Sequence, residues 1–260
     1  MSENQETQAE VLTEVRGNVL IITLNRPEAK NAASQAMAQK MATILDEFDA
    51  NDDLFVGIIT GAGGTFCSGM DLKGFLRGER PSIEGRGFLA LTEAPPRKPL
   101  IAAVEGYALA GGFETMLACD LVVAADTAKF GVPEVKRGLV AAAGGVTILP
   151  QRTSRAVAME MALTGNLYPA EFGKANGFVN TIVEEGKALD GALELAQTIA
   201  ANGPLAVQVS KQVITESQDW TQDEMWEKQA PLIADVFTSE DAKEGSRAFA
   251  EKRAPQWTGK

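Results

Sequence analysis

The sequence predicts an α/β protein with a mainly parallel sheet, followed by a helical C-terminal part. Two observations support this prediction. Short β-branched runs alternate with helix-length segments up to about residue 189, and strands separated by helices pair in parallel. Beyond that point only helical segments follow. A chain of 260 residues is long enough for one or two domains and for a sizeable buried core.

The elements of the first part follow from local periodicity. The continuous β-branched run VLIITL over residues 19–24 suits a buried strand, and Ser34 opens the helix that follows it. An Asn-Asp-Asp sequence ends that helix. Further strands are predicted over residues 54–60, 100–106, 120–125 and 178–183, with a glycine-rich turn over residues 61–71 and a helix from Gly111 onward.

Four successive helices are predicted at the C-terminal end, over residues 189–202, 204–217, 221–237 and 239–253. Pro204 and Ser239 are residues that commonly begin helices. We place the boundary at the Asn-Gly-Pro sequence that ends at Pro204. The chain is thereby divided into an α/β core, residues 1–202, and a helical subdomain, residues 203–260.

Composition excludes several classes of function. The chain has 24 Lys and Arg against 35 Asp and Glu, a net charge of −11, which argues against general binding to nucleic acid or anionic membranes. It has no histidine, so Ser-His-Asp, Cys-His and His-ligated metal mechanisms are excluded and no metal site is predicted. Cys67 and Cys119 form no Cys-x-x-Cys pair, which favours a reducing cytoplasm.

No targeting or membrane segment is predicted. Residues 1–11 have neither a basic nor an apolar signal region, so they are interpreted as a short polar lead. The most apolar stretch, residues 99–125, is interrupted by three acidic residues. We therefore expect a cytoplasmic protein without a membrane partner.

Three glycine-rich turns are candidates for nucleotide binding, at residues 61–64, 110–112 and 141–145. None matches a known fingerprint, because Phe66 stands where the dinucleotide motif requires glycine and no turn carries the Gly-Lys-Ser/Thr of a P-loop. Nicotinamide and ATP chemistry are therefore not expected. Glycine after a strand also makes ordinary turns, and that interpretation stays open here.

Two carboxylates and two of these turns suggest a different site. N–H groups of Ser68 and Gly111 could hold the oxygen of a polarised carbonyl. Each turn comes just after a predicted strand, and Glu114 and Glu134, twenty positions apart, could divide general acid and base work.

Five motifs occur in order along the chain: LNRPEAKNA (24–32), FCSGMDL (66–72), AAVEGYALAGGFE (102–114), CDLVVAADTAKFGVPEVKRGL (119–139) and AMEMALTG (158–165). Together they resemble the crotonase family, whose core members are enoyl-CoA hydratases. The resemblance extends from about residue 11 to residue 253. It implies a crotonase-like spiral of ββα units, a helical C-terminal part that forms homotrimers or homohexamers, and an acyl-CoA thioester as substrate. No separate cofactor is implied, since coenzyme A is part of the substrate.

The resemblance also assigns roles at the site. It places the two oxyanion N–H groups on Ser68 and Gly111. Glu134 would supply the proton to the α-carbon, while Glu114 orients and helps to deprotonate the water that attacks the β-carbon. An acid beside an apolar acyl chain should have a raised pKa. The alternatives are that Ser68 is a turn residue, that Glu114 lies on a solvated helix face and that Glu134 is a first-turn helix acid.

An acidic chain needs local basic residues to bind a polyanionic CoA. Arg26, Lys30 and Lys73 are the candidates, although a solvated surface lysine is the alternative for each. The resemblance also implies that the C-terminal helix of a neighbouring subunit contributes to CoA binding. Asp71 is expected chiefly to cap the helix that follows Asp71 in the sequence. The complete predicted set for substrate and CoA is Arg26, Lys30, Met70, Asp71, Leu72, Lys73, Ala142, Phe249 and Lys252.

The chain departs from the usual pattern of the family in several places. Ala110 replaces the first glycine of a triplet, and Met70 stands where a smaller residue is common. In residues 138–150, beside the acyl pocket, Ala141 and Ala142 replace the usual Pro-Gly pair. The type of acyl group is therefore left open.

The predicted function is hydration of the 2,3-double bond of an enoyl-CoA to give a 3-hydroxyacyl-CoA. Two alternatives remain. One is an isomerase or another reaction of the same family. The other is a non-catalytic acyl-CoA-binding or assembly protein that shares only the fold.

Overall fold

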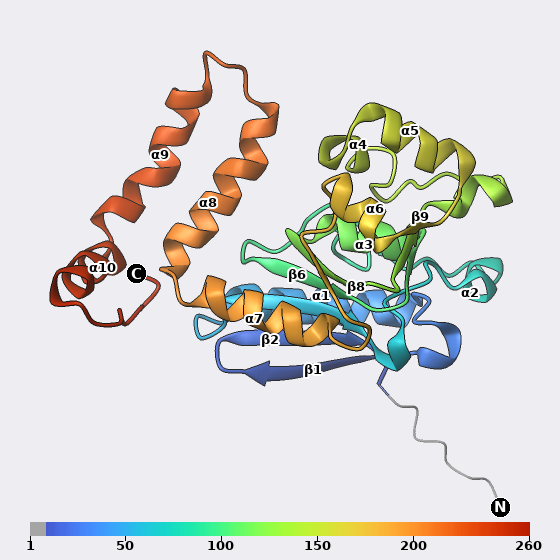
Figure 1. The fold of residues 1–260 in the computed structure, drawn as a ribbon, viewed down its shortest axis with the longest axis horizontal. Coiled ribbons are helices and arrows are strands. Elements are labelled where there is room, and N and C mark those ends of the chain that lie inside the picture. The colour runs from blue at the N-terminus through green and yellow to red at the C-terminus, as the bar shows by residue number, and fades with distance from the viewer. Residues whose placement is uncertain (1–8) are drawn as a thin grey trace, which may run out of the picture.

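The computed structural model describes residues 9–260, and most of the predicted polar lead lies outside the described residues. A six-stranded sheet in the order β1-β2-β3-β6-β8-β11 forms the centre of the fold (Figure 1). Every neighbouring pair is parallel except the β1–β2 hairpin, so the predicted mainly parallel sheet is confirmed. Its strands are β1 (Val11–Arg16), β2 (Val19–Leu24), β3 (Val56–Gly61), β6 (Leu100–Val104), β8 (Leu121–Ala125) and β11 (Thr181–Val183).

Helices cover both faces of this sheet, which is why its central strands are continuous apolar runs. Helix α1 (Gln35–Ala50) begins at Ser34, whose Oγ accepts the Met37 N–H at 3.0 Å as a helix cap. Helix α7 (Ala188–Ala200) packs on the opposite face through its buried alanines, residues 188, 192 and 196. Small side chains at these positions let the helix approach the strands closely.

A second layer positions the start of helix α3 (Gly111–Ala118) beside the sheet. A small sheet in the order β10-β9-β7 leads into this helix. Three buried rings, Phe113, Phe130 and Phe178, fix it there by tilted and edge-to-face contacts between centroids 5.5–6.2 Å apart. The remaining elements before α7 are η1 (Pro27–Ala29), η2 (Ala62–Gly64), α2 (Leu72–Leu76), β4 (Ser82–Ile83), β5 (Gly87–Phe88), β7 (Tyr107–Leu109), β9 (Lys129–Gly131), η3 (Pro133–Arg137), α4 (Leu149–Arg152), α5 (Arg155–Thr164), β10 (Tyr168–Pro169) and α6 (Ala170–Ala175).

The four predicted C-terminal helices are confirmed. The last three, α8 (Pro204–Glu216), α9 (Met225–Thr238) and α10 (Glu240–Glu251), extend away from the sheet, whereas α7 lies on it (Figure 1). A short 3₁₀ turn, η4 (Ser217–Asp219), follows α8. Lys211 of α8 ties this helix to the core, because its Nζ lies 2.7 Å from Asp120 Oδ2 and donates to two backbone carbonyls. The division of the chain at residue 203 stays a prediction.

Within residues 9–260, no helix is both long and apolar enough to cross a membrane.

Candidate active site

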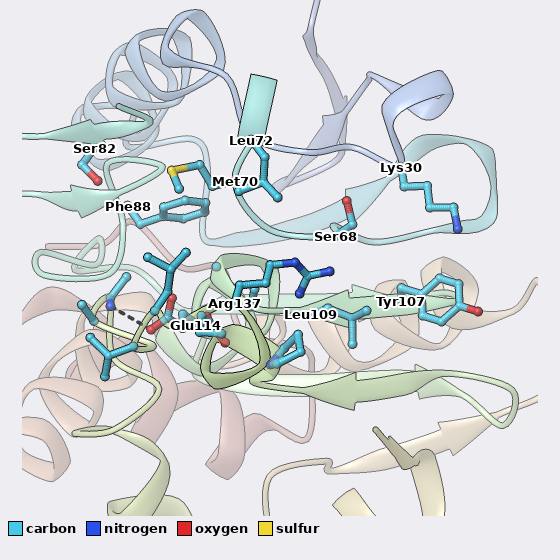
Figure 2. Close-up of a pocket in the computed structure, with 18 of the residues that line it drawn as sticks. Lys30, Ser68, Met70, Leu72, Ser82, Phe88, Tyr107, Leu109, Glu114 and Arg137 are labelled. Carbon is cyan, nitrogen blue, oxygen red and sulfur yellow. Dashed lines mark hydrogen bonds between the residues drawn. The ribbon is translucent and has the colours of Figure 1, made fainter. Parts of the chain in front are cut away.

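A cavity of about 570 Å³ opens beside the start of α3 (Figure 2). The loop after β3 and helix α2 form one wall, and η3 with the segment that follows it forms the other. The lining residues are Lys30, Ser68, Met70, Leu72, Ser82, Phe88, Glu93, Tyr107, Leu109, Ala110, Gly111, Glu114, Pro133, Glu134, Arg137, Leu139, Val140, Ala142 and Ala143.

The two predicted turns are in direct contact. Cys67 pairs with β7, donating to the Tyr107 carbonyl at 2.9 Å and accepting the Leu109 N–H at 3.0 Å. A Cβ atom on Gly112 would lie 2.2 Å from the Cys67 oxygen, so only glycine fits there. Ala110, which replaces a usual glycine, has a φ of +52°, a region that favours glycine.

The structure contradicts the prediction for the Ser68 N–H. This group donates to the Lys30 carbonyl at 3.0 Å, so it is not free to bind a substrate oxygen. Two residues further on, Met70 lines the cavity. The Ala33 N–H donates to the Gly69 carbonyl, and the Ala33 carbonyl accepts the N–H of Asp71. The N–H of Met70, between these two residues, therefore points away from Ala33. Among the described residues it has no acceptor.

The prediction for Gly111 agrees with the geometry. Its N–H is the first of α3 and therefore has no acceptor within the helix. A Cβ atom on Gly69 would lie 3.4 Å from the Gly111 nitrogen and 2.8 Å from the Ala110 Cβ, so the two turns meet at this point. The free N–H groups of Met70 and Gly111 thus line one cavity.

Glu114 is buried, with 3% of its surface exposed, which excludes the solvated helix face considered for it. Its Oε1 accepts the N–H groups of Ala143 at 2.7 Å and Gly145 at 2.9 Å. Burial, with a smaller contribution from the charge of Glu134, raises the pKa of Glu114 to about 7, although both hydrogen bonds act in the opposite direction. A proton can therefore be exchanged here near neutral pH.

Glu134 follows Pro133 in the first turn of η3, as an ordinary helix acid would, but it also lines the cavity. Its Oε2 is buried and, within residues 9–260, has no hydrogen-bond partner. Burial raises the pKa of this carboxyl, and the charge of Arg137 partly opposes the effect. An unpartnered buried carboxyl oxygen is suited to giving or taking a proton.

The predicted CoA-binding residues separate into two groups. Lys30, Met70, Leu72 and Ala142 line the cavity. The structure does not bring Arg26, Asp71 or Lys73 to it. The Arg26 guanidinium is held by Asp71 at 3.1 Å, by Glu10 at 3.2 Å and by a backbone carbonyl. Asp71 caps α2 through the N–H groups of Lys73 and Gly74, so this pair supports the loop instead of contacting a ligand.

Two further predicted residues, Phe249 and Lys252, belong to the end of α10, far along the chain from the cavity wall, and do not line the cavity of their own chain.

Several lining residues were not predicted from the sequence. Arg137 lies three positions after Glu134, and residues at this spacing share a face of a 3₁₀ helix, so the spacing could have indicated it. Phe88 and Ser82 come from a segment without a sequence signal. Two free N–H groups and two carboxyls, one buried and one half-buried, line a single cavity, an arrangement that can stabilise the oxygen of a polarised carbonyl and transfer protons beside it.

Comparison with known proteins places this chain in a family. A family model described as enoyl-CoA hydratase/isomerase matches residues 14–260. Enoyl-CoA hydratase EchA19 of Mycobacterium tuberculosis is 41% identical over 263 residues, covering 97% of each chain. Carnitinyl-CoA dehydratase of Proteus mirabilis is 40% identical over 253 residues, covering 94% of this chain and 97% of that protein.

Comparison with solved structures supports the same family. The crystal structure of enoyl-CoA hydratase EchA1 from Mycobacterium marinum has a TM-score of 0.96 and 57% identity, covering 97% of this chain and all of that one. The fold is therefore crotonase-like, as predicted. The chain belongs to the enoyl-CoA hydratase/isomerase family and is an enzyme of the hydro-lyase class.

Proposed function

We propose that this enzyme adds water across the 2,3-double bond of a 2-enoyl-CoA, giving a 3-hydroxyacyl-CoA, with no cofactor beyond the CoA of the substrate. One observation carries the proposal. Glu114 and Glu134, both with raised pKa values, line the same cavity as the free N–H groups of Met70 and Gly111. Relatives named enoyl-CoA hydratase and carnitinyl-CoA dehydratase support the same type of reaction.

The N–H groups of Met70 and Gly111 would accept the thioester oxygen, which gains negative charge when the β-carbon is attacked. Losing one such donor typically costs about 3 kcal/mol of transition-state stabilisation. Met70 replaces Ser68 as the predicted donor to the thioester oxygen. The Ser68 N–H is bonded to Lys30, whereas the Met70 N–H is free.

The carboxyls would divide the transfer of water between them. Ala143 and Gly145 fix one oxygen of Glu114, which leaves the other to orient water and take its proton as the hydroxyl bonds to the β-carbon. Glu134 gives its proton to the α-carbon. Exchange with solvent then returns a proton to Glu134 and removes one from Glu114, so the sum of the steps is the addition of one water molecule.

A panel of 2-enoyl-CoA thioesters with short, long and aromatic acyl groups tests the proposal through loss of the conjugated thioester absorbance. We expect Glu134→Gln to abolish turnover while the Kd for CoA stays unchanged. Glu185→Gln, an exposed glutamate, is the matched control and should be fully active. Near-normal turnover by Glu134→Gln would exclude the proton-transfer role.

The same panel separates the alternatives. Conversion of a 3-enoyl-CoA by a variant with Glu114 truncated, without hydration, would favour an isomerase, which needs chiefly one proton carrier. Stabilisation by acyl-CoA without any product would favour a binding protein.

We also propose that the chain forms a homotrimer or a homohexamer through its C-terminal helices. Large apolar side chains on α8–α10 are exposed in the single chain, among them Ile214, Trp226, Phe237 and Phe249, the last at 88%. In such an assembly, Phe249 and Lys252 of a neighbouring subunit would cover the CoA. Light scattering tests this proposal, and a monomer would refute it.

A further inference from the structure

Arg26 does not line the cavity, yet its guanidinium holds both chain segments that meet at Met70. Its Nη1 donates to the Ala32 carbonyl at 2.6 Å, and its Nη2 lies 3.1 Å from Asp71 Oδ2. Its Nε lies 3.2 Å from Glu10 Oε1, so every nitrogen of the group has a partner. The Arg26 side chain is only 17% exposed, and a planar guanidinium bonded in this way has a fixed geometry.

The Ala32 carbonyl begins a chain of hydrogen bonds that leads into the cavity. This carbonyl and the Ala33 N–H belong to one peptide unit, and that N–H donates to the Gly69 carbonyl at 2.8 Å. The Gly69 carbonyl and the Met70 N–H belong to a second peptide unit. Both units are trans, so in each the N–H points opposite to the carbonyl. The bonds therefore run from the guanidinium through two peptide units to the free Met70 N–H, which lies at the cavity.

This arrangement strengthens the Met70 N–H as a donor, because hydrogen bonds arranged head to tail polarise one another. A guanidinium that donates to the first carbonyl draws electron density toward that oxygen. The N–H of the same peptide unit then donates more strongly to the next carbonyl, and the effect ends at Met70. Net charge does not carry it, because the carboxylates of Glu10 and Asp71 both lie beside Arg26 and oppose its field.

We propose that Arg26 is a positioning residue for the reaction: through this chain of bonds it directs the Met70 N–H at the thioester oxygen and strengthens that contact as the oxygen gains charge. The inference rests on the proposed function, which places the thioester oxygen at Met70 and Gly111. In this role Arg26 touches no substrate atom. Because the effect grows in the transition state, loss of Arg26 should lower kcat and leave the binding of CoA unchanged.

Isotope-edited infrared spectroscopy of a bound saturated acyl-CoA, labelled at the thioester carbonyl, measures this polarisation without turnover. We expect the carbonyl frequency to fall when the unmodified enzyme binds the compound, because both N–H groups then bond to the oxygen. Arg26→Met, whose side chain has no donor, should lose part of that fall. Its kcat for a 2-enoyl-CoA should drop about tenfold, less than when an oxyanion donor is lost outright, with the Kd for CoA unchanged.

Three further variants separate this role from simple support of the loop. Asp71→Asn removes the ion pair, but its Oδ1 can still cap α2 and the bond from Arg26 to Ala32 remains, so most of the frequency change should persist. Arg26→Lys keeps the charge and the fold, but one ammonium drawn to two carboxylates leaves the Ala32 carbonyl without its donor, so it should resemble Arg26→Met. Arg16→Met breaks an exposed pair with Glu14, changes the net charge equally and should behave as the unmodified enzyme.

Any of four results would overturn the proposal: no fall of the carbonyl frequency in the unmodified enzyme, an undiminished fall in Arg26→Met or Arg26→Lys, an equal loss in Asp71→Asn, or a raised Kd for CoA as the only effect. A saturated acyl-CoA cannot be hydrated, so this outcome is independent of the hydratase assay. Silence across the enoyl-CoA panel, with a carbonyl frequency that depends on Arg26, would refute only the hydration.

Discussion

Replacing Glu114 by Gln should stabilise the protein above neutral pH while removing its activity. The side chain is 3% exposed and its pKa is raised by burial from 4.5 to about 7. Between these two pH values Glu114 stays protonated in the folded chain and is ionised in the unfolded chain. Unfolding then releases a proton, so the free energy of unfolding falls as the pH rises, and above the folded pKa the loss is complete.

The structure gives the size of this effect. Each pH unit between the two pKa values corresponds to about 1.4 kcal/mol, so the ionised carboxylate costs the folded state about 3 kcal/mol. Gln lacks the titration, yet its Oε1 can still accept the N–H groups of Ala143 and Gly145. The stability gained by Glu114→Gln should therefore grow by about 2–3 kcal/mol from about pH 5 to pH 8 and then stay constant.

Urea unfolding at a series of pH values measures this difference. Both proteins must be compared at one protomer concentration, because assembly also contributes to apparent stability. Glu185→Gln, at an exposed position, should show no such dependence. A difference between Glu114→Gln and the unmodified protein that does not change with pH would refute the argument from burial.

Two further substitutions test the framework of the site. Gly112→Ala should cost about 1–3 kcal/mol and reduce turnover, because its Cβ would lie 2.2 Å from a backbone oxygen; thermal unfolding measures the loss, and Gly203→Ala, with no atom closer than 3.7 Å to its Cβ, should be near neutral. Lys211→Met should cost about 1–3 kcal/mol in urea unfolding, because Asp120 loses a partner 2.7 Å away. Lys243→Met, in an exposed pair, should change stability by no more than about 0.5 kcal/mol, and an equal loss in both lysine variants would contradict the role given to the α8 attachment.

Much of the fold could be predicted because its central strands are buried on both faces and are therefore continuous apolar runs. Strand β1 was missed because only Val11 in it is buried, which leaves no apolar pattern to detect. The predicted strand over residues 178–183 is shorter than expected. Phe178 and Val179 pack against Gly173 of α6 instead, so only residues 181–183 pair with the sheet.

The two carboxylates of the site could be predicted from the sequence, whereas one of its two N–H donors could not. Both glutamates reach one cavity, as the motifs indicated. The choice between the N–H groups of Ser68 and Met70 depends on the pairing of Met70 with Ala33, a contact between distant parts of the chain that local sequence does not encode. Arg26 was interpreted as a ligand residue from its charge alone, but charge does not show that an internal partner already holds it.

The segment that carries Ala143 and Gly145 holds Glu114 through backbone N–H groups alone. The side chains of its neighbours Val140 and Ala142, which face the cavity, take no part in those bonds. Because neither side chain bonds to Glu114, we expect their exchange to leave the position of the carboxylate unchanged. Under the proposed function, natural selection or a directed library could therefore change the preference for the acyl group at these two positions while the two glutamates keep their places, so that one scaffold could serve many thioesters.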